Sequence, residues 1–126
     1  MTINEATTKR FPTGIPKDIA LDWMIQMAEA IHYLHTEKGV CHRDLHGGNW
    51  MVTDDNKSVT LIDFGTSLIV GKGLMVPKTF AFHAFQSPQI IAGLPGSFDG
   101  DIWYLGMIFF SFVNKGCLPW NGYNMG

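Results

Sequence analysis

The sequence predicts a mainly α-helical fold with one small β-hairpin, and three patterns carry this prediction. Apolar residues recur at helical intervals from about Lys17 to His35. Residues 99–116 (DGDIWYLGMIFFSFVNKG) are apolar nearly all round, as in a buried helix. Two short segments of strand character lie between these helices and flank the polar turn DDNKS. The 126 residues suffice for one modest domain.

The first 14 residues are polar and include Pro12 and Gly14, so we expect an irregular lead-in over 1–14 and the domain itself over 15–126. Pro16 suits the first turn of the helix that follows. The apolar stripe of this helix consists of Ile19, Trp23, Met27, Ile31 and Leu34, widened by Met24 and Ala28. Gly39 is expected to end it.

Residues 42–50 read HRDLHGGNW, and the pair Gly47-Gly48 predicts a loop here. The hairpin strands are expected at Trp50–Thr53 and Val59–Ile62. Residues 66–86 have no clean period and predict a long surface loop, which is uncommon in a compact domain unless it is functional.

Composition narrows the class of protein. The chain is 46% hydrophobic and only 16% charged, which excludes a disordered segment. Its net charge is −2 and Arg10 and Arg43 are its only arginines, so we expect no nucleic-acid partner. Cys41 and Cys117 lack metal-type spacing and are interpreted as reduced core thiols. The apolar run 102–113 falls short of the ~20 residues of a spanning helix. Without a signal-peptide pattern, we expect a cytoplasmic protein that does not enter a membrane.

Three polar residues around the hairpin suggest a chemistry. Asp44, Asn49 and Asp63 offer oxygen atoms, which a hard cation such as Mg²⁺ prefers. A carboxylate that binds no metal can instead accept a proton from a hydroxyl nucleophile. The short hairpin between Asn49 and Asp63 would fold the chain back and bring the three together, and Gly47 and Gly48 would let the loop approach a ligand closely.

These residues stand in motifs that resemble the protein kinase family. HRDLHGGN is similar to the catalytic loop H-R-D-x-x-x-x-N, and IDFG is similar to the metal-binding D-F-G. SPQ at 87–89 resembles a degraded A-P-E, and DIWYLG at 101–106 resembles the D-x-W-x-x-G helix of the family. The resemblance covers about residues 15–122 and implies the central part of a kinase carboxy-terminal lobe.

The resemblance implies a role for each matching residue. Asp44 would be the catalytic base that deprotonates the acceptor hydroxyl, and Asn49 and Asp63 would hold Mg²⁺ on the phosphates of ATP. Met51 would lie under the adenine. Further implied roles are internal support by His42, Phe64 and Asp101, and binding of an activation-loop phosphate by Arg43, with Thr79 as the best candidate phosphosite.

The sequence also departs from the family. His46 stands two residues after the base, where Ser/Thr kinases usually carry a lysine, and a neutral imidazole offers less charge to the transferring phosphate. The glycine-rich loop, the strand lysine and the helix glutamate of the amino-terminal lobe have no counterpart in the 126 residues. We therefore expect a fragment whose exposed core is covered by that lobe or by a partner chain, and which is inactive by itself.

Three functions stay open at this point. The first is ATP-dependent phosphorylation of protein Ser/Thr residues by the complete form. The second is a small-molecule phosphotransferase of the aminoglycoside or choline kinase kind, whose H-x-D-L-H-x-x-N motif fits His46 better. The third is a catalytically inactive scaffold of pseudokinase type. SPQ, DIWYLG and the later LPWNG favour the protein kinase.

Overall fold

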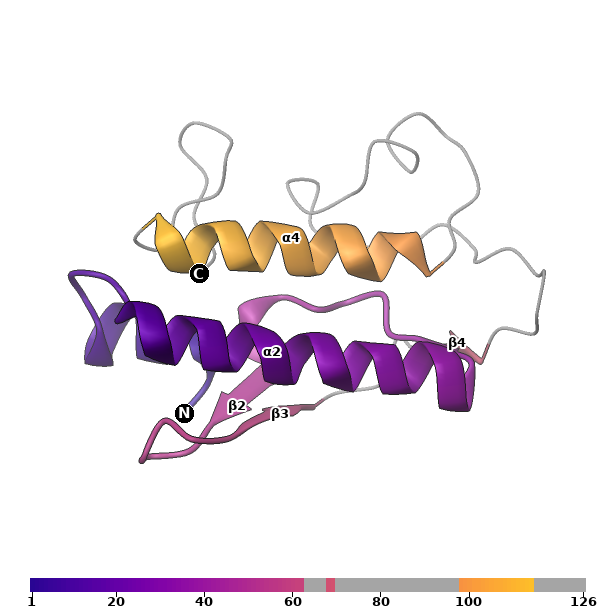
Figure 1. The fold of residues 1–126 in the computed structure, drawn as a ribbon, viewed down its shortest axis with the longest axis horizontal. Coiled ribbons are helices and arrows are strands. Elements are labelled where there is room, and N and C mark those ends of the chain that lie inside the picture. The colour runs from indigo at the N-terminus through magenta and orange to yellow at the C-terminus, as the bar shows by residue number, and fades with distance from the viewer. Residues whose placement is uncertain (63–67, 70–97, 115–126) are drawn as a thin grey trace.

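The computed structural model describes residues 1–62, 68–69 and 98–114, and two long helices dominate this part of the chain. Helix α2 (Lys17–Tyr33) and helix α4 (Asp99–Val113) lie side by side, with the hairpin of β2 (Trp50–Val52) and β3 (Val59–Leu61) below α2 (Figure 1). The prediction of a mainly α fold with a small hairpin is confirmed.

The predicted irregular lead-in over residues 1–14 is wrong for most of its length. A short helix α1 (Ile3–Glu5) continues into a π-helical segment at Ala6–Arg10. The Thr2 hydroxyl accepts from the Glu5 amide at 3.1 Å while the Glu5 carboxylate accepts from the Thr2 amide at 3.2 Å, a capping box that starts the helix. Ile3 and Ala6 are fully buried. These two apolar residues lie three positions apart in an otherwise polar stretch, which is too short a pattern to have predicted a helix.

Helix α2 follows the predicted pattern and ends two residues before the predicted limit at His35. Its buried face carries Trp23, Met27 and Ile31. After Tyr33 the chain continues as a π-helical segment, Leu34–Lys38, and then stops at Gly39, whose φ of +62° is the left-handed cap that glycine adopts without strain.

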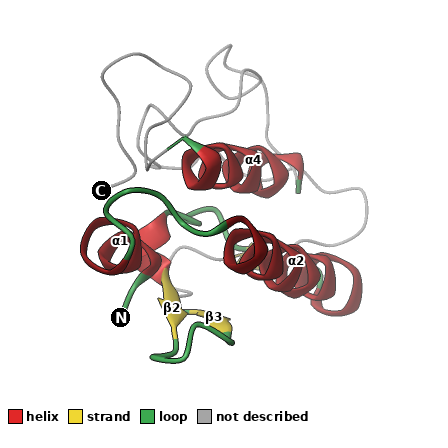
Figure 2. Cartoon of the chain, turned by 60° about the vertical axis from the view of Figure 1, so that its left-hand side comes forward, coloured by secondary structure: helices red, strands yellow, loops and turns green. Residues whose placement is uncertain are grey.

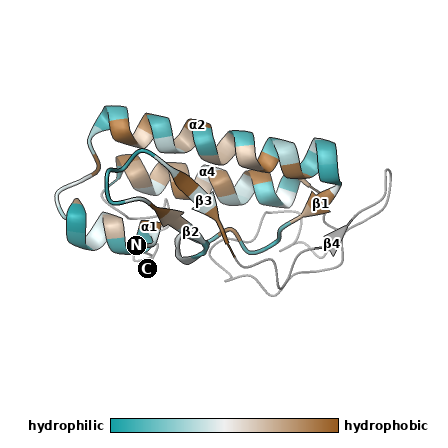
Figure 3. Cartoon of the chain, turned by 90° about the horizontal axis from the view of Figure 1, so that it is seen from below, coloured by the Kyte–Doolittle hydropathy of each residue, from teal (hydrophilic) through white to brown (hydrophobic). Residues whose placement is uncertain are grey.

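The hairpin pairs Trp50 with Leu61 and Val52 with Val59. Figures 2 and 3 show its two strands side by side from two directions. Figure 3 also shows both strands as hydrophobic and the turn between them as hydrophilic, the pattern that predicted this element. The turn is fixed to the helices, because the Trp23 indole donates to the carbonyl of Asn56 at 2.9 Å. A second antiparallel pair, β1 (Val40–Cys41) with β4 (Leu68–Ile69), was not expected.

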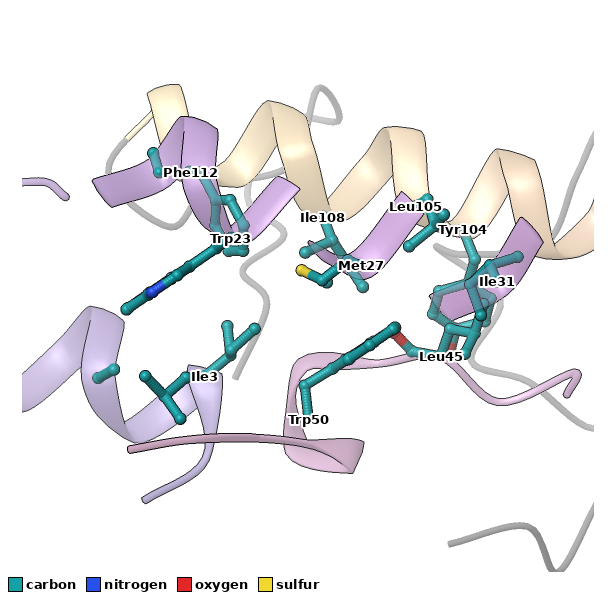
Figure 4. Close-up of a cluster of buried hydrophobic side chains, with 13 residues drawn as sticks. Ile3, Trp23, Met27, Ile31, Leu45, Trp50, Tyr104, Leu105, Ile108 and Phe112 are labelled. Atoms are coloured by element: carbon teal, nitrogen blue, oxygen red, sulfur yellow. The ribbon is translucent and has the colours of Figure 1, made fainter. Parts of the chain in front are cut away.

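The hydrophobic core lies between the two long helices and the hairpin. Leu45 from the loop and Trp50 from β2 point into it together with Trp23, Met27 and Ile108 of the helices, and all five are fully buried (Figure 4). A fully buried side chain of this size contributes about 1.5–3 kcal/mol. The loop is therefore anchored by its own side chain and not only by its ends.

Helix α4 is not buried all round, which corrects the expectation for residues 99–116. Its inner face, with Tyr104 and Ile108, is buried, whereas the side chains of Ile102 and Val113 are 56% and 73% exposed. Helix α2 packs on this inner face, and His35 of the segment after α2 contacts Asp101 there. None of the described helices is both long and apolar enough to cross a bilayer.

Asp101 on α4 ties the helix to the start of the loop. One carboxylate oxygen, Oδ2, accepts from the His42 amide at 2.9 Å and lies 2.8 Å from Nε2 of His35. The other, Oδ1, accepts from the Arg43 amide at 2.9 Å. Burial by itself would raise the pKa of Asp101, but the hydrogen bonds from His35, Arg43 and His42 outweigh it and hold the pKa below its ordinary value of 3.8.

We expect Asp101→Asn to lower the free energy of unfolding by about 1–3 kcal/mol at neutral pH, because the amide has one acceptor oxygen for donors on two sides. The stabilisation from the wild-type carboxylate is fully present above pH 3.8, the unfolded value, and is lost as the pH falls through the lower folded pKa. Urea unfolding against pH measures this. The fully exposed Asp54→Asn is the control, and an equal loss in both variants would contradict the assignment.

The Cys41 thiol should be unreactive in the folded chain. Burial, followed by the charge of Asp101, raises the pKa of Cys41 from 9.0 to about 12, so its thiolate fraction is about a thousandfold smaller than that of an ordinary thiol. In a Cys117→Ser background, iodoacetamide at about pH 8 should label Cys41 only after unfolding. Equal labelling rates with and without denaturant would show that the thiol is accessible. Cys41 is a buried thiol that forms no disulfide among the described residues, and Cys117 lies outside them.

Candidate catalytic loop

The loop of residues 42–49 is closed onto the end of the hairpin. Its last residue, Asn49, belongs to a 3₁₀ turn (Gly47–Asn49) and accepts a hydrogen bond on its carbonyl from the Ile62 amide at 2.8 Å. Its first residue, His42, is fully buried, and its Nε2 lies 3.3 Å from the Ile62 carbonyl. The hairpin thus returns the chain to both ends of the loop, as the spacing predicted.

Asp44 and Asn49 are brought together as the sequence predicted. The Asn49 side-chain amide donates to the Asp44 carbonyl at 2.7 Å and to its carboxylate Oδ2 at 3.3 Å. The Asp44 amide donates in turn to Nδ1 of His42 at 3.2 Å. The Asp44 side chain keeps 27% of its surface exposed, so the carboxylate is held by the loop and still open to a substrate.

His46 lies against the same carboxylate. Its Nδ1 accepts from the Gly48 amide at 3.1 Å, and its Nε2 is 3.6 Å from Oδ2 of Asp44. On the core side, the Trp50 indole donates to the Leu45 carbonyl at 3.3 Å and secures the middle of the loop. Tyr104 lies behind the loop, and burial together with the charges of Asp44 and Asp101 raises the pKa of its hydroxyl, which therefore stays protonated.

Arg43 has a φ of +74°, a conformation that costs a non-glycine residue about 1–3 kcal/mol. The hydrogen bond from its amide to Asp101 holds that conformation.

Met51 is 36% exposed between the buried Trp50 and Val52. Its backbone forms an isolated antiparallel β-bridge with Thr2 at the start of the chain. Its exposure agrees with a side chain that could contact a ligand.

Several of the predicted residues lie outside the described part of the chain. These are Asp63, Phe64 and Thr79, together with the SPQ motif and LPWNG. Ile62, the residue before Asp63, is hydrogen-bonded to Asn49, which fixes the point from which the chain proceeds. Within residues 1–62, 68–69 and 98–114, no group of three His, Cys, Asp or Glu side chains could hold a metal.

The resemblance named Asp101 and His42 as internal supports, and the hydrogen bond between them confirms that link. The sequence assigned no functional role to His35, which stands at the end of the predicted helix. Its side chain is 11% exposed, contacts Asp101 and stacks on Phe98 at a ring distance of 4.4 Å. No local signal marks His35, because Asp101 lies 66 residues further along the chain.

Comparison with known proteins bears directly on this loop. The protein kinase domain family matches residues 3–125, so the match includes α1. The serine/threonine-protein kinase kin-29 of Caenorhabditis briggsae is 33% identical over 105 residues, which are 81% of this chain and 12% of that protein. The sperm motility kinase Z of mouse is 34% identical over 111 residues, 86% of this chain and 21% of that protein.

The human NUAK family SNF1-like kinase 1 is 33% identical over 100 residues, which are 79% of this chain and 15% of that protein. The chain thus spans between about one tenth and one fifth of the length of these relatives. The motif order in the sequence, the Asp44–Asn49 pair closed onto the hairpin and the match over nearly all residues agree with one another. The chain belongs to the protein kinase family, with serine/threonine-protein kinases among its relatives.

Proposed function

We propose that this chain supplies the catalytic loop for transfer of the terminal phosphate of Mg²⁺-bound ATP to Ser or Thr hydroxyls of a protein substrate. The protein kinase family generally uses ATP and Mg²⁺ and acts on proteins, and the relatives named as serine/threonine-protein kinases support this acceptor. The observation that carries the proposal is the fixed, half-open Asp44 carboxylate beside Asn49.

Asp44 acts as the general base in this proposal. Its Oδ2 is faced by the Asn49 amide, and its Oδ1 has no hydrogen-bond partner among the described residues. Oδ1 is therefore the oxygen available to accept the proton of an incoming hydroxyl. Because the Asp44 backbone is held at both its amide and its carbonyl, the carboxylate does not need to be ordered when the substrate arrives.

The donor set of the loop fits Mg²⁺. The nitrogen of the Asn49 side chain is used by Asp44, which leaves its carbonyl oxygen Oδ1 as the atom for a hard cation, and Asp63 would add a carboxylate. Bound Mg²⁺ would offset the negative charge of the phosphates during transfer. Because the amide of Asn49 can donate to Asp44 while its oxygen binds the cation, this residue couples the base to the nucleotide.

Two further roles complete the proposal. Met51 offers an exposed, flexible side chain above the buried Trp50 and Val52 and is assigned to the adenine. Arg43 is assigned to a phosphate on the activation segment, with Thr79 as the candidate acceptor. The protein that contains this loop would also need the amino-terminal lobe or a partner chain to complete the nucleotide site.

We expect the 126-residue chain, purified by itself, to phosphorylate a generic protein substrate no faster than background. A glycine-rich loop and a strand lysine for the phosphates have no counterpart in its sequence. Transfer of radiolabelled phosphate from ATP measures this. Robust phosphorylation that disappears in Asp44→Ala would contradict the expectation and would show that the loop suffices.

In a form of the protein that carries those elements, Asp63→Asn should abolish Mg²⁺-dependent nucleotide binding. Asp44→Asn should leave binding intact and lower kcat by about 10²-fold to 10⁴-fold, the contribution of a general base. Calorimetry and initial rates measure the two effects. Asp18→Asn, at an exposed position in the first turn of α2, is the matched control. Equal loss of binding in the Asp44 and Asp63 variants would refute the assigned roles.

The acceptor class has its own test because His46 also fits the motif of small-molecule phosphotransferases. The same active form is offered a Ser/Thr peptide library, a set of aminoglycosides and choline. We expect transfer to peptides only. Transfer to a small molecule would change the substrate class while leaving the role of Asp44 intact, and a folded protein that transfers to none would favour a scaffold.

A further inference from the structure

The imidazole of His46 is held in one tautomer. Its Nδ1 accepts from the Gly48 amide at 3.1 Å, and a ring nitrogen that accepts a hydrogen bond carries no proton. The proton of the neutral ring is therefore on Nε2. This is the nitrogen that lies 3.6 Å from Oδ2 of Asp44, so the N–H group lies beside the carboxylate.

Gly48 makes this placement of the ring possible. A Cβ at position 48 would lie 2.9 Å from Cε1 and 3.0 Å from Nδ1 of His46, so the imidazole would have to shift. Nδ2 of Asn4, from α1, would lie 3.8 Å from the same Cβ. Gly48 does not adopt the left-handed conformation, so glycine is required here for space and not for its backbone freedom.

We propose that His46 is a positioning residue that fixes the orientation of the Asp44 carboxylate, locked for this task by the Gly48 amide. The N–H groups of His46 and Asn49 both lie beside Oδ2, which leaves Oδ1 for the hydroxyl of the proposed substrate. At 3.6 Å the His46 contact is longer than a hydrogen bond and acts by attraction between the N–H dipole and the charge. This inference rests on the proposed role of Asp44 as the base.

The first measurement is the tautomer itself. In the full chain labelled with ¹⁵N-histidine, long-range ¹H–¹⁵N correlation spectra distinguish a ring protonated on Nε2 from one protonated on Nδ1, and the signal absent from His46→Gln identifies residue 46. We expect the Nε2–H form. The Nδ1–H form, or exchange between both, would overturn the proposal without any variant having to fold.

A matched pair of substitutions then separates the two contacts of the ring. His46→Asn keeps an acceptor near the position of Nδ1 but offers nothing at Nε2, whereas His46→Gln can place its amide N–H near the position of Nε2. The readouts are the ¹³C shift of the Asp44 carboxyl carbon and the Asn49 side-chain amide signals. We expect these signals to move in His46→Asn and to return toward wild type in His46→Gln. Unchanged signals in His46→Asn would show that His46 does not act on Asp44.

Gly48→Ala tests independently whether the position of the His46 ring depends on the space at residue 48. Its methyl group should displace the imidazole and move the same Asp44 and Asn49 signals in the wild-type background, but not in a His46→Ala background, where no ring is present to be displaced. Equal shifts in both backgrounds would mean that Gly48 acts on the loop directly and would refute the lock. All these spectra are recorded without nucleotide, so a failure of the proposed phosphate transfer leaves their outcome readable.

Discussion

The carboxylate of Asp101 is the contact on which the geometry of the loop depends. It lies on α4, inside the core, and receives the amides of His42 and Arg43 as well as the imidazole of His35. Burying a charge costs several kcal/mol, and hydrogen bonds to a charged group return roughly 1.5–3 kcal/mol each. Because these three donors offset the burial together, Asp101 holds the loop, the π-helical segment after α2 and α4 against one another at this point.

From this fixed start, each following residue of the loop is positioned by a different part of the fold. Leu45 enters the core and its carbonyl is held by the Trp50 indole, so the segment between Asp101 and the hairpin has little freedom. Ile62 then closes the loop from the other side through Asn49. These contacts hold Arg43 in its strained backbone conformation. The Asp44 carboxylate, which lies between them, stays partly exposed.

His46, which departs from the family pattern, fits into the loop because of the residues around it. A histidine at position 46 needs a neighbour without a side chain, and Gly48 provides it, while α1 packs on the same turn through Asn4. A lysine would bring a full charge on a flexible chain, whereas this imidazole is held by the Gly48 amide with its Nε2 3.6 Å from Oδ2 of Asp44. Under the proposed function, orientation of the Asp44 carboxylate would take the place of charge near the phosphate.

The sequence by itself determined the helix from Lys17, its end at Gly39, the hairpin and the pairing of Asp44 with Asn49, because periodicity, turn chemistry and motif spacing are local signals. The helical start of the chain had a local sign in the capping box of Thr2 and Glu5. Only the tertiary structure decided the single buried face of α4 and the partnership of His35 with Asp101. Those depend on what packs against a segment from far along the chain, and the 66 residues between His35 and Asp101 contain no local sign of that contact.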